Sequence, residues 1–313
     1  MSTSATQMLV VPELKDILFA TDFSLCSEAV LPFLRSLALG CASTVHVVHV
    51  IAHEAENSLA LKLAPRLDAE YREADDAIQS LLANLAFGGI NYTSTVERGN
   101  VGEVLTSLAE KKHVGLIVLG THGRRGLRKL VLGSTAEQVI RTASCPVLTL
   151  GPHACHEAKA QVKPESIIVA MDFEAGPHPA LRFAASLARA NHVGLILLHA
   201  VPPSMDVPQV NVHAIPFNPV FSAELTARVL AASRRQMEEM ISSEQLQDLE
   251  PQIIVETGPA ADMILRNAQE RAAGLIVMGA HRARMHSVAS HLPWALASAV
   301  LCEAPCPVIT ICY

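Results

Sequence analysis

The same series of short segments occurs twice in this 313-residue chain. The matching segments follow one order in both copies: residues 15–23 match 166–173, 47–50 match 197–200, 96–99 match 255–258, 115–120 match 274–279, and 145–149 match 306–310. Ordered repetition of this kind indicates duplication of a structural unit. The length agrees with this interpretation, since about 150 residues is a common domain size. We therefore expect one domain over 12–151, a polar linker over 152–164 and a second domain over 165–313.

Within each copy, aliphatic runs of strand length alternate with stretches of helix length. In the first copy the aliphatic runs lie at 17–20, 45–51, 116–119 and 147–150, and the helical stretches lie at 24–39, 60–85, 101–112 and 135–142. Mostly aliphatic runs are typical of parallel strands that are covered on both faces. The first helix is expected to begin at an N-cap, Ser24, and to end at Gly40. The alternation predicts an α/β fold: two tandem open, doubly wound, five-stranded parallel sheets of Rossmann-like type.

Composition and charge argue against several classes of protein. Hydrophobic residues make up 50% of the chain and charged residues 17%, so a large core can form and disorder is excluded for most of the chain. The net charge of −6 and the single tryptophan, Trp294, argue against a nucleic-acid-binding protein. No apolar run approaches the ~18–20 residues that a membrane-spanning helix needs. Seven irregularly spaced cysteines, and an N-terminus without a basic segment before an apolar run, predict a cytoplasmic protein with reduced thiols.

A glycine-rich segment follows the run at 116–119 and is the sharpest local signal. Gly120 ends the run, Gly123 comes soon after it, and Gly133 directly precedes Ser134, where a helical stretch begins. Ligands of such sheets bind beyond the carboxyl ends of the strands, and a backbone without side chains can approach a ligand closely. Amides at the start of the helix, with the hydroxyls of Ser134 and Thr135, can bind phosphate oxygens. The alternative is that the glycines only form turns and that the nearby basic residues face solvent.

Local charge and two further residues favour a phosphate-containing ligand at this edge. Residues 111–136 include six Lys or Arg residues and no Asp or Glu, and Arg124 lies in the loop itself, so it is a candidate ligand contact. Asp22 directly follows the first strand and can accept hydrogen bonds from ribose hydroxyls, cap the helix that follows, or do both. Val50 can offer its backbone amide and carbonyl to a base, although core packing explains it equally well.

Residues 20–24, the pair His49-Val50 and the spacing of Gly120, Gly123, Gly133 and Ser134 resemble the universal stress protein family. The resemblance covers nearly the whole chain as two tandem domains and implies an adenine nucleotide α-hydrolase-like fold. The complete glycine motif implies that the first domain is of the ATP-binding type, with Asp22 at the ribose and Val50 at the adenine. The other residues that the resemblance places around ATP are Ala20, Thr21, Leu119, Gly120, Gly123, Gly133, Ser134 and Thr135. It also implies pairing through the last strands, hence an internal pseudo-dimer, with a further homodimer left open.

The second copy departs from this motif. Gly279 is retained, but Arg282 stands in place of the second glycine, and Leu292 and Pro293 stand where glycine and serine are expected. A proline has no amide hydrogen to donate to a phosphate. Although Asp172 remains, we expect the second copy not to bind ATP in the manner of the first. The sequence therefore predicts about one nucleotide per chain.

Three functions remain in competition at this level. The first is an ATP-dependent stress-response switch, with Mg²⁺ as a candidate companion of the nucleotide and at most slow hydrolysis. The second is a nucleotide-independent interaction module with a vestigial pocket. The third is an adenylating enzyme, which ranks last because the chain contains neither a His-x-Gly-His nor a Ser-Gly-Gly pattern. No catalytic or metal-ligating residue is assigned, since the cluster of His153, Cys155 and His156 lacks the spacing of a zinc site.

Overall fold

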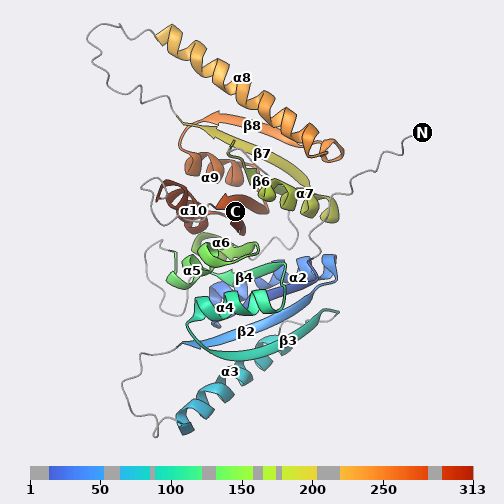
Figure 1. Cartoon of the computed structure of the whole chain (residues 1–313), viewed down its shortest axis with the longest axis vertical. Helices are drawn as coiled ribbons and strands as arrows, with labels where there is room; N and C mark the ends of the chain where they lie inside the picture. Colours follow the sequence, from blue (N-terminus) through green and yellow to red (C-terminus); the bar gives the residue numbers. More distant parts are fainter. Residues whose placement is uncertain are drawn as a thin grey trace, which may run out of the picture.

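The computed structural model describes residues 14–52, 64–84, 89–121, 132–157, 165–173, 178–202, 219–280 and 291–312. These residues form two α/β halves that share one ten-stranded sheet (Figure 1). The elements of the first half are β1 (Asp16–Ala20), α1 (Leu25–Ala29), α2 (Leu31–Cys41), β2 (Thr44–Ala52), α3 (Ala64–Asn84), β3 (Asn91–Gly99), α4 (Val101–Lys111), β4 (Leu116–Gly120), α5 (Ser134–Thr142) and β5 (Val147–Leu150).

The second half repeats this order after a short connecting helix, α6 (Pro152–Glu157). Its elements are β6 (Ser166–Ala170), α7 (Pro179–Asn191), β7 (Gly194–Val201), α8 (Pro219–Ser243), the 3₁₀ turn η2 (Gln247–Leu249), β8 (Gln252–Thr257), α9 (Ala260–Glu270), β9 (Leu275–Ala280), α10 (His291–Glu303) and β10 (Val308–Cys312). The predicted duplication is thus present as two copies of the same chain path.

The strands are ordered β3-β2-β1-β4-β5-β10-β9-β6-β7-β8 across the sheet. The strand pairs inside each half are parallel, whereas β5 and β10 pair antiparallel in the centre. This central pairing through the two last strands is the internal pairing that the family resemblance implies. In each half the chain order reverses beside the first strand, at β1/β4 and at β6/β9, which is where ligands bind in open α/β sheets.

The seam between the halves is reciprocal in its hydrogen bonds. Thr149 donates its hydroxyl to the Val308 carbonyl at 3.4 Å, and Thr310 donates its hydroxyl to the Val147 carbonyl at 3.3 Å. Both threonines are buried. The two halves are therefore joined as two subunits of a symmetric dimer would be.

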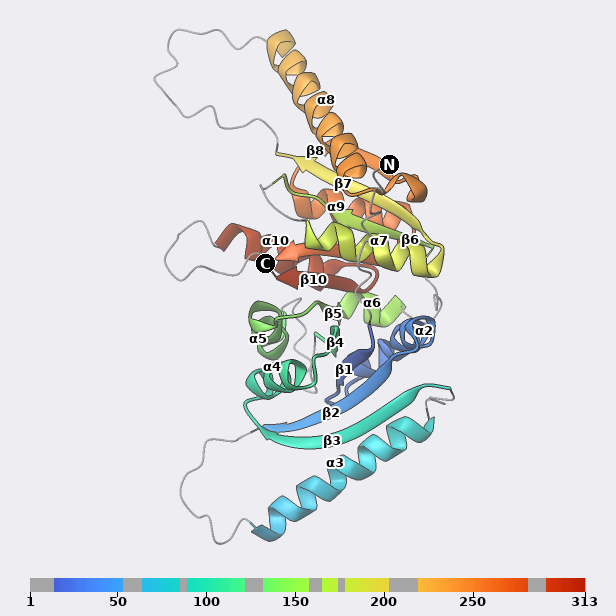
Figure 2. The same cartoon turned by 45° about the vertical axis from the view of Figure 1, so that its right-hand side comes forward.

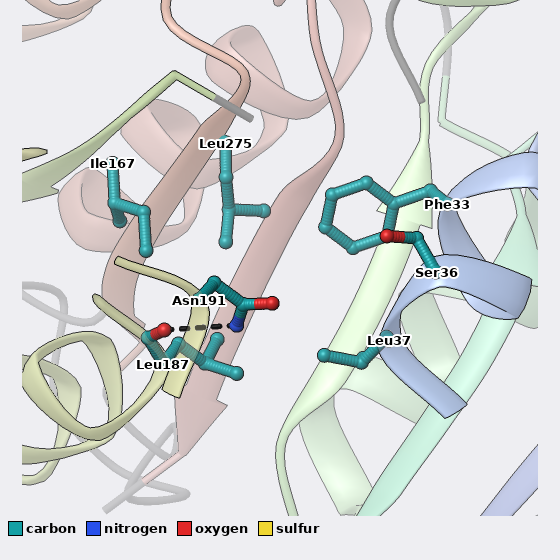
Figure 3. A pocket seen from close by; sticks show the side chains of 7 residues that line it. All are labelled: Phe33, Ser36, Leu37, Ile167, Leu187, Asn191 and Leu275. Atoms are coloured by element: carbon teal, nitrogen blue, oxygen red, sulfur yellow. Dashed lines mark hydrogen bonds between the residues drawn. The ribbon is translucent and has the colours of Figure 1, made fainter. Parts of the chain in front are cut away.

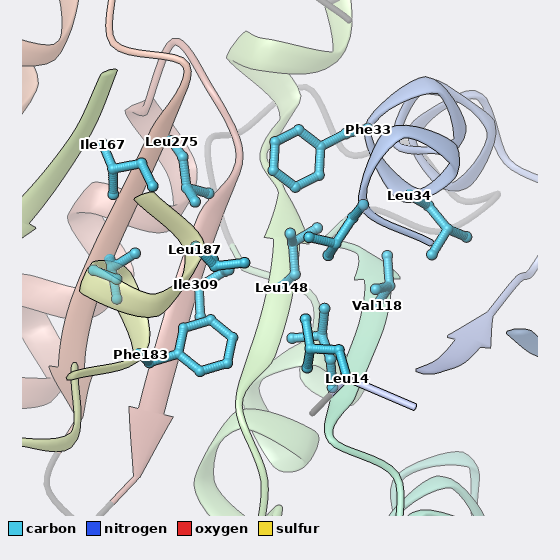
Figure 4. Packing of buried hydrophobic residues seen from close by; sticks show 14 of the residues in the cluster. Leu14, Phe33, Leu34, Val118, Leu148, Ile167, Phe183, Leu187, Leu275 and Ile309 are labelled. Carbon is cyan, nitrogen blue, oxygen red and sulfur yellow. The ribbon is translucent and has the colours of Figure 1, made fainter. Parts of the chain in front are cut away.

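Helices cover both faces of the sheet (Figure 2). Side chains from α2, α3, α7 and α8 pack on one face, and side chains from α4, α5, α9 and α10 pack on the other. Each layer continues across the seam: in Figure 4, Phe33 of α2 and Leu148 of β5 lie opposite Leu187 of α7 and Ile309 of β10. The aliphatic sequence of the central strands supplies this core, since burial of apolar surface on both faces is what stabilises a parallel sheet.

The helix that the sequence predicts over 24–39 is two helices. The break lies at Val30, between α1 and α2, and the next residue but one is Pro32, which has no N–H for a helical hydrogen bond. The prediction that this helix ends at Gly40 is wrong, because α2 continues to Cys41 and Ala42 forms the cap in the left-handed conformation, φ 52°. The amide of Ala42 closes the helix by donating to carbonyls of the last turn.

Two further findings concern the segment that connects the halves and the length of the helices. The segment expected to be a polar linker begins with α6, which packs between α1 of the first half and α10 of the second. None of the helices in the described ranges is both long enough and apolar enough to cross a lipid bilayer.

Candidate functional site

The sheet register brings most of the predicted ligand residues to one edge. Ala20, the last residue of β1, pairs with Val48 of β2 on one side and with Leu119 of β4 on the other. Thr21 continues from β1 and donates its amide to the Val48 carbonyl at 2.9 Å. Val50 lies near the end of β2 and is buried. These residues therefore meet at the carboxyl ends of β1, β2 and β4, as the sequence predicts.

The turn after β1 is held by its own side chains. The amide of Phe23 donates to the Thr21 hydroxyl at 3.0 Å, and the amide of Ser24 donates to Oδ1 of Asp22 at 3.0 Å. The Ser24 hydroxyl accepts the Ser27 amide at 3.3 Å and forms the N-cap of α1. The cap of α1 is therefore Ser24, whereas the half-buried Asp22 holds the turn through the Ser24 amide and is not the helix cap that the sequence offered as one alternative.

A second contact fixes this turn to β2. His49 Nδ1 lies 2.8 Å from the Thr21 carbonyl oxygen, and the His49 ring packs on Phe23 with centroids 4.7 Å apart. Phe23 adopts a positive φ of 58°, which is uncommon for a bulky residue. Because the imidazole and the ring contact hold this conformation, His49 positions the turn that carries Asp22.

The start of α5 returns to the end of β4. Gly133 is the N-cap of α5 and donates its amide to the Thr121 carbonyl at 3.0 Å. Thr121 is buried and is itself tied to β5, since its amide and its hydroxyl both donate to the Leu150 carbonyl, at 3.2 and 3.0 Å. Ser134 and Thr135 then form the first turn of α5, where no side chain caps the helix. The first amides of a helix have no intrahelical partner, so this end can bind an anion.

The glycines at both ends of this segment are needed for packing of the chain on itself. A Cβ at Gly120 would lie 2.9 Å from the Ser27 nitrogen on α1, and a Cβ at Gly133 would lie 2.7 Å from the Thr121 oxygen. Neither distance is tolerated without a backbone shift. The sequence interpretation explained these glycines by close approach of a ligand, whereas in the structure close approach of the protein's own backbone already requires them.

Part of the predicted site lies outside the described residues. Gly123 and Arg124 fall within 122–131, which the structure does not describe, and Arg282 falls within 281–290. Within the described part, Ala20, Thr21, Asp22, Val50, Leu119, Gly120, Gly133, Ser134 and Thr135 are placed by the elements given above.

The sequence assigned no role to Ser27 or Thr121, and it gave His49 no structural role beyond its place in the repeat and in the family resemblance. Ser27 Oγ lies 3.2 Å from Thr21 Oγ1 and donates to the Ser24 carbonyl at 2.9 Å, so it connects α1 to the end of β1. The position of Thr121 directly after Gly120, at the end of a predicted strand, could have indicated that it lies at the site.

The second half repeats the turn but changes the helix start. His199 Nδ1 lies 2.8 Å from the Met171 carbonyl oxygen, and its ring packs on Phe173 with centroids 4.0 Å apart. Pro293, however, lies within the first turn of α10 and reduces the number of amides that this helix can offer. Asp172 is exposed, whereas Asp22 is half-buried.

Three cavities among the described residues are lined by residues other than these site residues. A small one of about 20 Å³, room for little more than a water molecule, lies at the seam between α2 and α7 (Figure 3). In Figure 3, Phe33 and Leu37 of α2 face Leu275 and Asn191 of the second half. A second cavity of about 310 Å³ lies between α1, α2 and α6 and the turns before β9 and β10, and a third is an open groove between α3 and β3. In the described part of the chain, no group of three or more His, Cys, Asp or Glu side chains is arranged to hold a metal ion.

Comparison with known proteins identifies the repeated unit. The model of the universal stress protein family matches residues 13–150 and again 164–311. Universal stress protein A homolog 1 of Coxiella burnetii is 34% identical over 143 residues, which cover 44% of this chain and 95% of that protein. Universal stress protein E of Escherichia coli K12 is 46% identical over 84 residues, which cover 25% of this chain and 27% of that protein.

A solved structure matches the chain along most of its length. The crystal structure of a universal stress protein from Archaeoglobus fulgidus has a TM-score of 0.67 and 19% identity, and the match covers 96% of this chain and 97% of that one. This likeness supports the fold with both halves in place. Among the similar solved structures is the crystal structure of a universal stress protein in complex with cAMP.

Proposed function

Because this chain belongs to the universal stress protein family and carries two tandem domains of it, we propose that its first half binds ATP and acts as a nucleotide-dependent stress-response switch. The observation that carries this proposal is the return of α5 to the end of β4. The bond from the Gly133 amide to the Thr121 carbonyl sets the uncapped start of α5 beside the turn that carries Asp22. An anion site and a carboxylate at one sheet edge match two parts of a nucleotide, its phosphates and its ribose.

The proposed contacts follow from this arrangement. The first amides of α5, with the hydroxyls of Ser134 and Thr135, bind the phosphates. Asp22 accepts from the ribose hydroxyls, and the backbone of Val50 faces the adenine. The walls are formed by Ala20, Thr21, Leu119 and Gly120, and the contacts of Gly123 and Arg124 are proposed from sequence. Mg²⁺ accompanies the nucleotide through the phosphates.

A switch needs a ligand that distinguishes two states of the protein. ATP can shift an equilibrium between states only by its differential affinity for them. ATP is proposed to hold together the start of α5 and the turn that carries Asp22, because one bound nucleotide would contact both. The second half carries Pro293 at the matching helix start, so we propose one ATP per chain.

Isothermal titration calorimetry of the full chain with Mg-ATP tests the proposal. Wild type is expected to bind close to one ATP per chain. Asp22→Asn keeps an oxygen for the Ser24 amide but removes the negative charge, and it is expected to weaken ATP binding about tenfold, as for loss of one charged hydrogen bond. The matched control, Asp172→Asn in the second half, is expected to bind like wild type.

Three results would contradict the proposal. Absence of binding at millimolar ATP would favour the nucleotide-independent interaction module instead. Two equal sites per chain would contradict the assignment to the first half. Equal weakening by the two asparagine variants would show that Asp22 does not act at the site.

A further inference from the structure

Two cysteine side chains from different helices meet beside the candidate site. Cys26 lies on α1, and Cys155 lies on α6, the helix that connects the two halves. α1 and α6 pack against each other, and the Cys155 thiol is close enough to Cys26 to act on its pKa. Both residues are partly exposed, and both are free thiols.

The position of Cys26 ties this pair to the sheet edge. Its Cβ lies 3.3 Å from where a Cβ on Gly120 would stand, so Cys26 packs directly on the end of β4. The negative charge of Asp22 also acts on the Cys26 thiol. Cys155 lies next to Ala154, which lines the 310 Å³ cavity at the seam. The pair therefore stands between the candidate site and the second half.

The surroundings of Cys26 disfavour its thiolate form. Burial, the neighbouring Cys155 thiol and the nearby charges raise the pKa of Cys26 to about 12. Because the thiolate is the reactive form of cysteine, Cys26 is a poor first nucleophile at neutral pH. The first attack on an oxidant therefore belongs to Cys155, and Cys26 is placed to resolve the product.

We infer that Cys26 and Cys155 form a peroxide-sensitive dithiol site, which closes to a disulfide between α1 and α6. In the first step the Cys155 sulfur attacks one oxygen of a hydroperoxide. An S–O bond forms, the O–O bond breaks, and the thiol proton leaves with the departing oxygen as water or alcohol. The product is a sulfenic acid on Cys155.

In the second step the Cys26 sulfur attacks the sulfenic sulfur. The S–S bond forms, the S–O bond breaks, and the Cys26 proton leaves with the hydroxyl group as water. The two sulfurs lose two electrons in total, and the peroxide takes them up. A dithiol reductant reverses the change by thiol–disulfide exchange.

The bond would fasten the first half to the connecting helix. It closes a long loop of the chain, from α1 to α6, and therefore restricts the unfolded state strongly. We expect the oxidised chain to unfold at a temperature roughly 5–10 °C higher than the reduced chain. None of this requires a bound nucleotide, so its failure and the failure of the proposed ATP site are separate results.

Peptide mapping of the full chain tests the inference directly. Reduced protein is freed of reductant, treated with a small excess of hydrogen peroxide, alkylated and digested without reduction. The expected main product is a peptide pair joined through Cys26 and Cys155. Recovery of both cysteines as alkylated thiols, or of other pairings in their place, would overturn the inference, and this result needs no variant.

Variants then separate the two roles. Cys155→Ser is expected to abolish the disulfide, whereas Cys26→Ser is expected to leave a sulfenic acid on Cys155 that a 1,3-diketone traps. The matched control is Cys41→Ser on α2, a half-buried thiol whose pKa is raised by burial alone. It is expected to oxidise like wild type. Trapping of sulfenic acid on Cys26 in the Cys155→Ser variant, at the rate seen for Cys155, would contradict the assigned order of attack.

Discussion

The carboxyl edges of the two halves share one feature and differ in another. In both, a histidine of the second strand bonds the carbonyl that follows the first strand at 2.8 Å and packs on a phenylalanine: His49 with Phe23, and His199 with Phe173. The helix start differs, since α5 follows an N-cap glycine whereas α10 has a proline in its first turn. The shared contact is therefore part of the fold, and the proposed ligand chemistry depends on the part that differs.

The largest expected effect comes from the helix start. Gly133→Asp places a Cβ 2.7 Å from the Thr121 oxygen. It also places a negative carboxylate at the N-terminal end of α5, which is the end proposed to bind the phosphates. We expect ATP affinity to fall at least about a hundredfold, equal to about 2.7 kcal/mol, as measured by calorimetry. The control is Leu292→Asp at the matching position of the second half, which is expected to keep ATP binding. If both variants bind ATP like wild type, the two edges do not differ in function.

The shared histidine contact is expected to give equal effects on stability. His49→Phe and His199→Phe each keep a ring but remove the hydrogen bond to a backbone carbonyl. Each is expected to lower the free energy of unfolding by about 1–2 kcal/mol, measured by urea denaturation. ATP affinity is expected to fall only for His49→Phe, because only that turn carries the proposed site. Loss of ATP binding in the His199 variant would contradict the division of roles between the halves.

A contact between α5 and α10 is expected to contribute less to stability, but its loss can be followed by tryptophan fluorescence. The guanidinium of Arg141 on α5 lies 4.2 Å from the ring centre of Trp294 on α10 and forms an ion pair with Glu137 at 3.0 Å. We expect Arg141→Ala to cost about 1 kcal/mol and to shift the emission of the chain's single tryptophan. The control is Arg228→Ala on α8, which removes an ion pair of the same spacing with Glu224 but no aromatic contact. Unchanged emission in Arg141→Ala would show that the two helices are not in contact there.

The smallest effect concerns an exposed ion pair in the second half. Arg189 bonds Asp248 at 2.6 Å and holds the pKa of that carboxyl below its usual range. A lowered folded-state pKa stabilises the protein above the ordinary carboxyl pKa of about 3.9, and this contribution is lost as pH falls through the lowered value. Because Asp248 is 56% exposed, we expect Asp248→Asn to cost only about 0.5 kcal/mol at pH 7. The difference from wild type in urea denaturation is expected to shrink in acid, and a difference that grows there would contradict the assignment.

Much of the fold could be predicted from the sequence because the repeat and the aliphatic runs are local signals. The order of strands and helices follows from them, and helices such as α4 and α5 begin and end close to the predicted residues. The break at Val30 was missed although Pro32 signalled it, because the amphipathic pattern continues through the break. The end at Ala42 was missed because its left-handed conformation is not indicated by residue type.

The candidate site was predictable to a similar extent. Asp22, Val50 and Ser134 could be assigned to one edge because strand ends of a parallel sheet share an edge, and the structure places them there. The requirement for glycine at position 120 could not be predicted, because it comes from the packing of α1 against the end of β4. The meeting of Cys26 and Cys155 was equally hidden, since α6 lies in a segment that the sequence presents as a linker.

The sequence by itself determined that this chain consists of two copies of one α/β unit and that only the first copy keeps the glycine–serine start of its last helix. Those facts are local in the chain, so residue order expresses them directly. Only the tertiary structure decided that β5 and β10 join the copies into one sheet, and that the uncapped end of α5 returns to Thr121 beside the Asp22 turn. Contacts between distant segments depend on how the helices pack over the sheet, and no single stretch of sequence specifies that packing.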